Sequence, residues 1–408
     1  MDQTVDQTVD PTYKNIPLKS TITAVQPMTG IVLWEDAWNS DSVKTSPGNI
    51  QLEYAYVKPS DIVSQRDTYN WSSFENFLNR IAGRSHQAVV RFYYVYPGET
   101  TAVPQYIKDL PDYNETSGTS EGQKTSFPDW THAELMRAHL AFYTAFALRY
   151  DNDPRVAFLQ TGFGLWGEYH IYDGPNAIGE QFPSKAFQET FLQHLAAELK
   201  TTHWSISIDA GDSYYSPFSA KPPLLGLEFG NFDDSFMHEQ HSDYNASMWD
   251  FFGHLQRYEH SPHGGELSYY STYDQEHALD AQGIYGRTYE QLSAKFHISY
   301  MIGNDQPLYQ SDARIRAAGM ANGYRFEVIS FRASSNHSWV HVRNVGIAPI
   351  YYDAFVAVNG IRAGESLKGL LPGATREYSI PAGGATPTLN VECDRLVAGQ
   401  KIDLHADL

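Results

Sequence analysis

Eight short apolar runs, separated by longer amphipathic segments, recur between residues 29 and 305 and constrain the fold more than any other feature. The runs are residues 29–36, 50–57, 86–97, 155–168, 204–211, 224–231, 264–271 and 297–305. Helical patterns lie near 73–82, from Thr131 onward, and near 184–200, 246–259, 287–296 and 308–321. Strands that alternate with helices are typical of a parallel sheet, and eight of them predict a closed (β/α)8 barrel. An open doubly wound sheet is the alternative.

The pattern changes after residue 322 to strands without helices, separated by Gly and Pro turns. This change predicts a C-terminal β-sandwich. We therefore expect a disordered N-terminal stub over 1–15, a barrel over 16–322 and an accessory sandwich over 323–408. Tyr351 and Tyr352 alternate as core residues would, so the sandwich is expected to be structural.

Composition excludes several classes of function. The formal net charge of -19, without a cluster of Lys and Arg, argues against nucleic acid as a partner. No run approaches the roughly 18 apolar residues of a membrane helix. The single cysteine, Cys393, allows no intrachain disulfide. The first residues lack the apolar core of a signal peptide, so the sequence is that of a cytoplasmic protein or of a mature secreted or periplasmic one. We favour the second, and we expect a monomer.

Acids and aromatic residues gather where the predicted strands end, which is where barrel enzymes carry their functional residues. Glu168, in the stretch GFGLWGEYH, and Glu266 lie on predicted strands four and seven, on opposite sides of the barrel mouth. Cleaving a glycosidic bond needs one carboxyl group to protonate the leaving oxygen and a second to attack the anomeric carbon or activate water. The spacing thus predicts a glycoside hydrolase, although each glutamate could instead serve a strand-end salt bridge or a helix cap.

The stretch DNDPRVAFLQTGFGLWGEYH resembles the fourth strand of clan A retaining glycoside hydrolases, and GGE at 264–266 is similar to their nucleophile strand. With NVGIAPIYY at 344–352, the chain also resembles poorly characterised bacterial proteins that join a barrel to a sandwich. The resemblance implies a retaining, endo-acting polysaccharidase with Glu266 as nucleophile and Glu168 as general acid/base. Some members of the group act on marine sulfated polysaccharides such as fucans, so the resemblance implies a polysaccharidase without fixing the sugar, and a sulfated fucan or galactan is one candidate substrate.

The usual Asn-Glu pair of the fourth strand is replaced by Gly167-Glu168, which makes Asp209 an alternative acid/base. Arg91, inside an apolar strand, needs a carboxylate partner. We expect it beneath Glu266, where it would keep the nucleophile ionised, with a structural ion pair elsewhere in the barrel as the alternative. Trp166 and Tyr169 would surround Glu168 and keep it protonated.

Aromatic rings at strand ends can stack on sugars, and polar groups beside them can bind hydroxyls. The residues expected to bind substrate are Trp34, Arg91, Tyr94, Trp166, His170, Tyr214, Glu228 and Asn304. An anionic polymer would also need local donors or cations, for which His170, His238, His263 and Lys58 are candidates.

Two rival hypotheses accompany the hydrolase. One is a non-catalytic carbohydrate-binding protein on a barrel scaffold. The other is a metal-dependent lyase or hydrolase, suggested by HEQH at 238–241 and HSPH at 260–263, although neither spacing fits a standard metal motif. We expect no metal and no cofactor.

Overall fold

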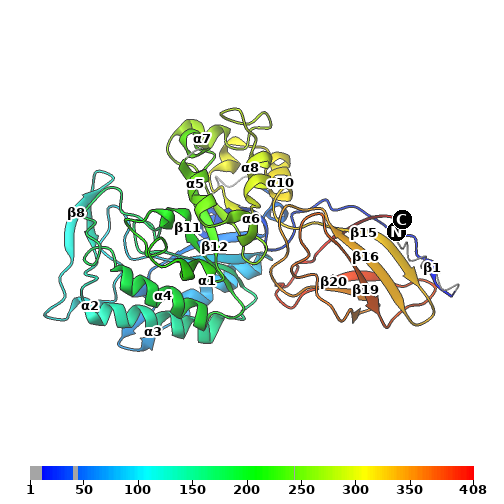
Figure 1. The fold of residues 1–408 in the computed structure, drawn as a ribbon, viewed down its shortest axis with the longest axis horizontal. Helices are drawn as coiled ribbons and strands as arrows, with labels where there is room; N and C mark the ends of the chain where they lie inside the picture. Colours follow the sequence, from blue (N-terminus) through cyan, green and yellow to red (C-terminus); the bar gives the residue numbers. More distant parts are fainter. Residues whose placement is uncertain (1–11, 40–44, 243) are drawn as a thin grey trace.

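Eight parallel strands close into a barrel in the computed structural model, which describes residues 12–39, 45–242 and 244–408. The strands follow one another around the barrel in chain order, with the last, β14, pairing with the first, β3. They are β3 (Gly30–Trp34), β4 (Leu52–Val57), β7 (Gln87–Phe92), β10 (Val156–Thr161), β11 (His203–Ser207), β12 (Gly230–Phe236), β13 (Gly264–Leu267) and β14 (Tyr300–Ile302). The predicted (β/α)8 barrel is confirmed (Figure 1).

Helices surround the barrel and bury apolar faces against it. They are α1 (Ser72–Gly83), α2 (Gln105–Lys108), α3 (Ala133–Tyr150), α4 (Lys185–Glu198), α5 (Tyr244–Phe251), α6 (His254–Arg257), α7 (Thr272–His277), α8 (Tyr289–Phe296), α9 (Gln306–Tyr309) and α10 (Asp312–Met320). The single helix expected over 246–259 is divided at Gly253, whose φ of 67° lies in the left-handed region. None of the helices in the described ranges has the length and apolarity that crossing a bilayer requires.

The sixth strand lies further along the chain than its apolar run indicates. The predicted run is 224–231, but residues 222–226 form a short 3-10 helix and the strand itself is Gly230–Phe236. Asp233 and Asp234 are therefore inside the strand, and Glu228 precedes it at the amino end of the barrel.

Two hairpins interrupt the barrel units. The first joins β5 (Val63–Gln65) to β6 (Thr68–Tyr69), and the second joins β8 (Thr116–Ser120) to β9 (Gln123–Phe127). The β8–β9 hairpin lies at the end of the molecule furthest from the C-terminal sheets (Figure 1).

The C-terminal part forms two sheets, as expected for a sandwich. One has the order β19 (Thr375–Ile380), β16 (Ser338–Asn344), β15 (Phe326–Ala333), β21 (Leu404–Asp407) and β2 (Lys19–Ser20), with β1 (Lys14–Asn15) also pairing with β15. The other contains β18 (Ile361–Arg362), β17 (Phe355–Val358) and β20 (Leu389–Glu392). Apolar side chains of both sheets, including Val340 and Val356, share one buried cluster.

The strands β1 and β2 belong to the C-terminal sheet, although their residues were expected in the N-terminal stub and in the barrel. Lys14 and Asn15 pair with Ala333 and Arg332, and Lys19 pairs with Asp407. Residues 1–11 of the predicted stub lie outside the described residues. The proposed boundary near residue 322 stays a prediction.

The sandwich packs on the amino ends of the barrel strands. The Tyr352 hydroxyl donates to the carbonyl oxygen of Ala157, and Arg395 donates from Nη2 to the carbonyl of Val156 at 2.7 Å. The ring of Tyr352 stacks on Phe158, and Tyr351 donates to the carbonyl of Tyr258 at 2.7 Å. Both tyrosines are buried, as expected. Since the sandwich covers the amino ends, the carboxyl ends form the opposite mouth of the barrel.

Candidate active site

The stretch GFGLWGEYH folds into a tight loop after β10 that brings Glu168 back over the strand end. The backbone carbonyl of Glu168 accepts from the amides of Phe163 and Gly164, at 2.9 and 2.8 Å. A Cβ at residue 164 would overlap the carbonyl of His170, and Gly167 has a φ of 72°. Glycines at these two positions thus permit the close turn that presents Glu168 and His170 together.

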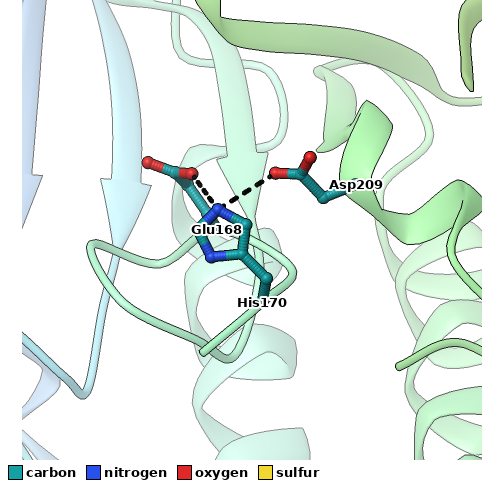
Figure 2. A group of neighbouring side chains, drawn as sticks. All are labelled: Glu168, His170 and Asp209. Atoms are coloured by element: carbon teal, nitrogen blue, oxygen red, sulfur yellow. Dashed lines mark ion pairs between the residues drawn. The ribbon is translucent and has the colours of Figure 1, made fainter. Parts of the chain in front are cut away.

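His170 bridges two carboxylates at the mouth (Figure 2). Its Nε2 atom lies 3.2 Å from Oε2 of Glu168 and 3.4 Å from Oδ2 of Asp209. Asp209 sits in the short 3-10 helix Ile208–Gly211 that follows β11, and it also accepts a 2.8 Å hydrogen bond from the Ser207 hydroxyl. Two of the three predicted acids therefore share one imidazole.

This arrangement determines which groups are charged. Burial lowers the pKa of His170, but the charge of Asp209 and the hydrogen bond to Glu168 outweigh it and raise the pKa to about 10. Burial raises the pKa of Glu168, yet the hydrogen bond and charge of His170, with the charge of Arg91, lower it below its usual value. Burial raises the pKa of Asp209, which His170 offsets only in part. Glu168 is thus an ionised carboxylate held by a cation.

Arg91 is fully buried inside the barrel, and its carboxylate partner is Asp234. Its Nη2 lies 2.7 Å from Oδ2 of Asp234, and Nη2 and Nε both donate to Oε1 of Gln160, at 2.6 and 2.9 Å. Its Nη1 donates to the carbonyl of Trp166 at 3.3 Å. The prediction that Arg91 forms its ion pair beneath Glu266 is wrong, because the extended sixth strand carries Asp234 into the barrel interior. Arg91, on β7, instead connects the loop of Glu168 to β10 and β12 through its hydrogen bonds.

Glu266 on β13 has the opposite electrostatic setting from Glu168. Burial and the negative charge of Asp234 raise the pKa of Glu266 well above its usual value, and Arg91 compensates only in part. Burial likewise raises the pKa of Asp234, to about 7, although Arg91 lowers it. The Oε1 atom of Glu266 is buried without a hydrogen-bond partner among the described residues.

The surroundings of Glu168 differ from those expected, since Tyr169 is buried and donates to Gln188 at 2.9 Å.

Four of the expected substrate-binding residues lie at the mouth beside these acids. Trp34 ends β3, and its backbone amide donates to Oδ1 of Asn304 at 3.0 Å. Trp166 has a φ of 54° and stacks on Tyr172 with ring centroids 6.2 Å apart. Tyr214 follows the 3-10 helix after β11 and donates to the carbonyl of Asn176 at 3.0 Å. The structure therefore places all four residues at or after the carboxyl ends of barrel strands, Trp34 and Asn304 at β3 and β14, and Trp166 and Tyr214 after β10 and β11.

Two expected substrate-binding residues lie elsewhere. Tyr94 is buried between the barrel and α3, where its hydroxyl lies 3.1 Å from Nδ1 of His139 and its ring contacts Trp130 edge-on. Glu228 is exposed and precedes β12, at the amino end of the barrel. Tyr94 follows β7 and is buried against α3, and Glu228 precedes β12, so the structure does not present either side chain at the carboxyl mouth.

Exposed tyrosines follow consecutive barrel strands near the acids. Their exposed fractions lie between 45% and 68%, which is unusual for aromatic side chains. They are Tyr172 after β10, Tyr214 after β11, Tyr244 after β12, and Tyr269 and Tyr270 after β13. Of these five, only Tyr214 is among the residues expected to bind substrate.

Asp234 and Gln160 are the central residues that the list of expected site residues lacks. Asp234 was detectable as one of two adjacent acids in NFDDSF, a stretch too apolar in its flanks for a surface loop. Gln160, fully buried on β10, is the register partner of Arg91 and donates to the Tyr300 hydroxyl at 2.9 Å. A polar residue in the apolar run VAFLQT was the available signal.

Among the described residues, one group has the spacing of metal ligands, and it is Glu168, His170 and Asp209, with one ligand atom of each within 4.8 Å of the others. The two histidine motifs that suggested a metal do not contribute to it. His263 of HSPH is buried with Nδ1 2.7 Å from the carbonyl of Phe296, and His238 of HEQH lies 2.7 Å from Asp274. The side chain of His241 lies outside the described residues.

No family model matches the sequence, and a search of curated proteins finds no relative. Solved structures similar to the chain have low sequence identity and low TM-scores, as three of them show. A xylanase from Paenibacillus barcinonensis is 9% identical, with 74% of this chain and 99% of that chain covered and a TM-score of 0.45. A trimodular endoglucanase is 10% identical, covering 94% and 78%, with a TM-score of 0.43. An α-galactosidase from Geobacillus stearothermophilus is 7% identical, with a TM-score of 0.37, and this chain spans 55% of its length. At such scores the similarities identify no reaction.

Proposed function

We propose that this protein is a glycoside hydrolase whose reacting carboxyl groups are Glu168 and Glu266. One arrangement carries the proposal: Glu168 follows β10 and Glu266 lies on β13, so both carboxyl groups belong to the mouth of one barrel, and their surroundings move their pKa values in opposite directions. Such a pair supplies a proton donor and a charged base or nucleophile at the same pH, which is what glycosidic cleavage requires.

The directions of these two pKa shifts favour roles opposite to those implied by the sequence resemblance. Glu266, whose pKa is raised by burial and by the charge of Asp234, is proposed as the general acid, which gives its proton to the glycosidic oxygen as the bond to the anomeric carbon breaks. Glu168, ionised beside His170, is proposed as the nucleophile that forms a bond to the same carbon. Water then attacks this carbon, its proton passes to Glu266, and the bond to Glu168 breaks, so both carboxyl groups return to their starting states.

His170 and Arg91 are positioning residues in this scheme. His170 holds Glu168 through a 3.2 Å ion pair, and Arg91 holds the loop of Glu168 through the Trp166 carbonyl. Asp209, on the other side of His170, is the alternative proton donor because burial raises its pKa.

The exposed tyrosines support a polymer as substrate. Flat rings stack on the apolar faces of sugars, and five such rings on the segments after four consecutive strands offer room for more than one sugar unit. On this ground we propose endo action on a polysaccharide. The sulfated fucan implied by the resemblance stays a prediction.

A metal-dependent hydrolase is the second candidate, favoured by the ligand spacing of Glu168, His170 and Asp209. One imidazole nitrogen and two carboxylate oxygens are a donor set that zinc accepts. In that case the cluster would hold the ion, and His170 would be neutral.

One assay separates these candidates. The protein is incubated with a panel of neutral and sulfated polysaccharides, and new reducing ends are measured with and without EDTA. We expect release that EDTA does not change and that Glu266→Gln lowers at least a hundredfold. Loss of activity with EDTA, restored by zinc, would instead support the metal-dependent candidate. Binding without release would indicate a carbohydrate-binding protein.

A further inference from the structure

The cationic side chains expected to bind an anionic sugar are already paired or buried. His170 lies between Glu168 and Asp209, and Nζ of Lys58 is 2.7 Å from Oε2 of Glu99. His238 has Nδ1 2.7 Å from Oδ2 of Asp274. His263 is fully buried at the amino end of β13, away from the mouth. Each of the four candidates therefore already has a carboxylate partner or is buried.

The buried cation of the site is equally committed. Arg91 has no exposed surface, and its guanidinium donates to Asp234, to Gln160 and to the Trp166 carbonyl. It therefore offers no surface that a substrate sulfate could contact. The positive charges of the site thus serve the protein's own carboxylates.

Carboxyl groups outnumber these cations on the segments that form the mouth. Those at or directly after the carboxyl halves of strands β10 to β14 are Glu168, Asp209, Asp212, Asp233, Asp234, Glu266 and Asp305. Asp233 is held by neutral donors, Nδ2 of Asn245 at 2.8 Å and Nε1 of Trp249 at 3.2 Å.

Negative charges also affect the pKa values of two of the exposed tyrosines, Tyr270 and Tyr244. Burial raises the pKa of Tyr270, and the charged groups that add to this shift, Asp209 and Glu168 foremost, are carboxylates. Burial also raises the pKa of Tyr244, with Asp209 and Asp212 as the charged contributors. The rings on which a sugar would stack therefore lie in a negative field.

We infer that the sugar chain accepted by this mouth is uncharged, with hydroxyl groups rather than sulfates or carboxylates around the cleaved bond. The inference rests on the proposed function and names its substrate class. Among the described residues, an anionic group would lie beside several carboxyl groups, while the cations His170 and Arg91 are already paired with carboxylates of the protein. Hydroxyl groups can donate hydrogen bonds to the same oxygens. This substrate class differs from the sulfated one that the sequence resemblance implies.

Matched pairs of polymers test the inference. Sulfated galactan, sulfated fucan and dextran sulfate are each compared with the desulfated backbone, together with xylan and β-glucan. Reducing ends are measured with the full chain, and binding with Glu266→Gln by affinity electrophoresis. We expect the best substrate to be neutral, and its sulfated form to bind and react at least tenfold less well. A sulfated polymer that performs as well as its neutral backbone, or better, would overturn the inference.

Salt and charge variants identify the cause. Screening by 0.3 M NaCl should improve the binding of the sulfated polymer relative to the neutral one, because it weakens repulsion. Asp212→Asn keeps the oxygen that accepts from the Tyr214 amide at 2.8 Å but removes a charge, and should also improve it severalfold. Glu365→Gln, an exposed acid of the sandwich, is the matched control and should change nothing. Salt that instead weakens the binding of sulfated polymers would contradict the inference.

The two proposals fail in different ways. If neutral polymers bind but are never cleaved, hydrolysis is wrong and the inference on charge stands. If a sulfated polymer is the best substrate, hydrolysis stands and the inference is wrong. If no polymer binds or reacts, both are wrong.

Discussion

The Nη2 atom of Arg91 on β7 lies 2.7 Å from Oδ2 of Asp234 on β12, so a single ion pair spans the interior of the barrel. The side chains are 0% and 6% exposed, so each charge depends on the other for compensation. The same guanidinium holds the loop that carries Glu168. Stability and site geometry thus depend on one residue.

Replacing Arg91 by Met should lower the free energy of unfolding by about 3 to 5 kcal/mol, because it leaves the buried carboxylate of Asp234 without a cation. Denaturant unfolding followed by circular dichroism measures this loss. Adding Asp234→Asn should restore most of the stability, because an amide carries no charge. Arg257→Met is the matched control: Arg257 donates to the carbonyls of Leu225, Leu227 and Phe229, so Asp234→Asn should not rescue it. An Arg91→Met variant as stable as the parent would contradict the pairing.

Removing the two glutamates should separate their roles. Glu168→Ala should abolish turnover, and azide should restore part of it as a glycosyl azide of inverted configuration, because azide enters where the nucleophile was. Glu266→Ala should cripple the natural polymer but spare aryl glycosides whose leaving group needs no proton, and azide should then give the retained configuration. Product anomers are assigned by NMR. The reverse pattern would support the roles implied by the sequence. If Asp209→Ala instead loses activity on the natural polymer but keeps it on aryl glycosides, Asp209 is the general acid.

The imidazole of His170 should titrate near pH 10, because Asp209 and Glu168 hold its proton against the effect of burial. Its pKa is higher in the folded protein than the ordinary value of 6.5, so its stabilising contribution is complete below pH 6.5 and is lost as the pH rises through about 10. NMR of the ring protons measures the titration directly. His203, whose pKa burial lowers to about 4, is the internal contrast. Titration of His170 near 6.5 would show that the bridge does not form.

The substitution Gly164→Ala should displace the Glu168 loop without unfolding the barrel, because the added Cβ would overlap the carbonyl of His170. We expect an unchanged circular dichroism spectrum, a fall in the pKa of His170 toward 6.5 and at least a tenfold loss of turnover. Gly226→Ala is the control, since nothing lies within 4 Å of the Cβ position there. Equal activity of the two variants would mean that the loop tolerates the change.

Most of the barrel could be predicted from the sequence because seven of its strands fall on apolar-rich runs, as buried parallel strands do. The sixth could not, because NFDDSF places two acids inside the barrel, where Arg91, Asn245 and Trp249 compensate them. These partners come from distant parts of the chain, so no local sequence pattern predicts them.

The site, like the barrel, could be predicted only in part. Glu168, Asp209 and Glu266 were identifiable as acids at strand ends, and the structure places the first two on one imidazole. The directions of their pKa shifts were not predictable, because they depend on which carboxylate forms the ion pair with Arg91. That choice is fixed by the strand register, which pairs Arg91 with Gln160 and Tyr56 and leaves the guanidinium facing Asp234.

The position of β21 between β15 and β2 has a consequence for how the molecule is made. Lys19 and Asp407, separated by 388 residues, form an ion pair at 2.8 Å, so the sheet cannot be completed until synthesis reaches its final strand. Pairing at such separation carries a large loop-closure cost and slows folding. During translation the barrel is made before β21. Until β21 is made, Phe326–Val328 of β15 lack their partner strand and are open to pairing with other chains. A nonsense mutation near residue 404 would therefore be expected to cause aggregation rather than the loss of a dispensable tail.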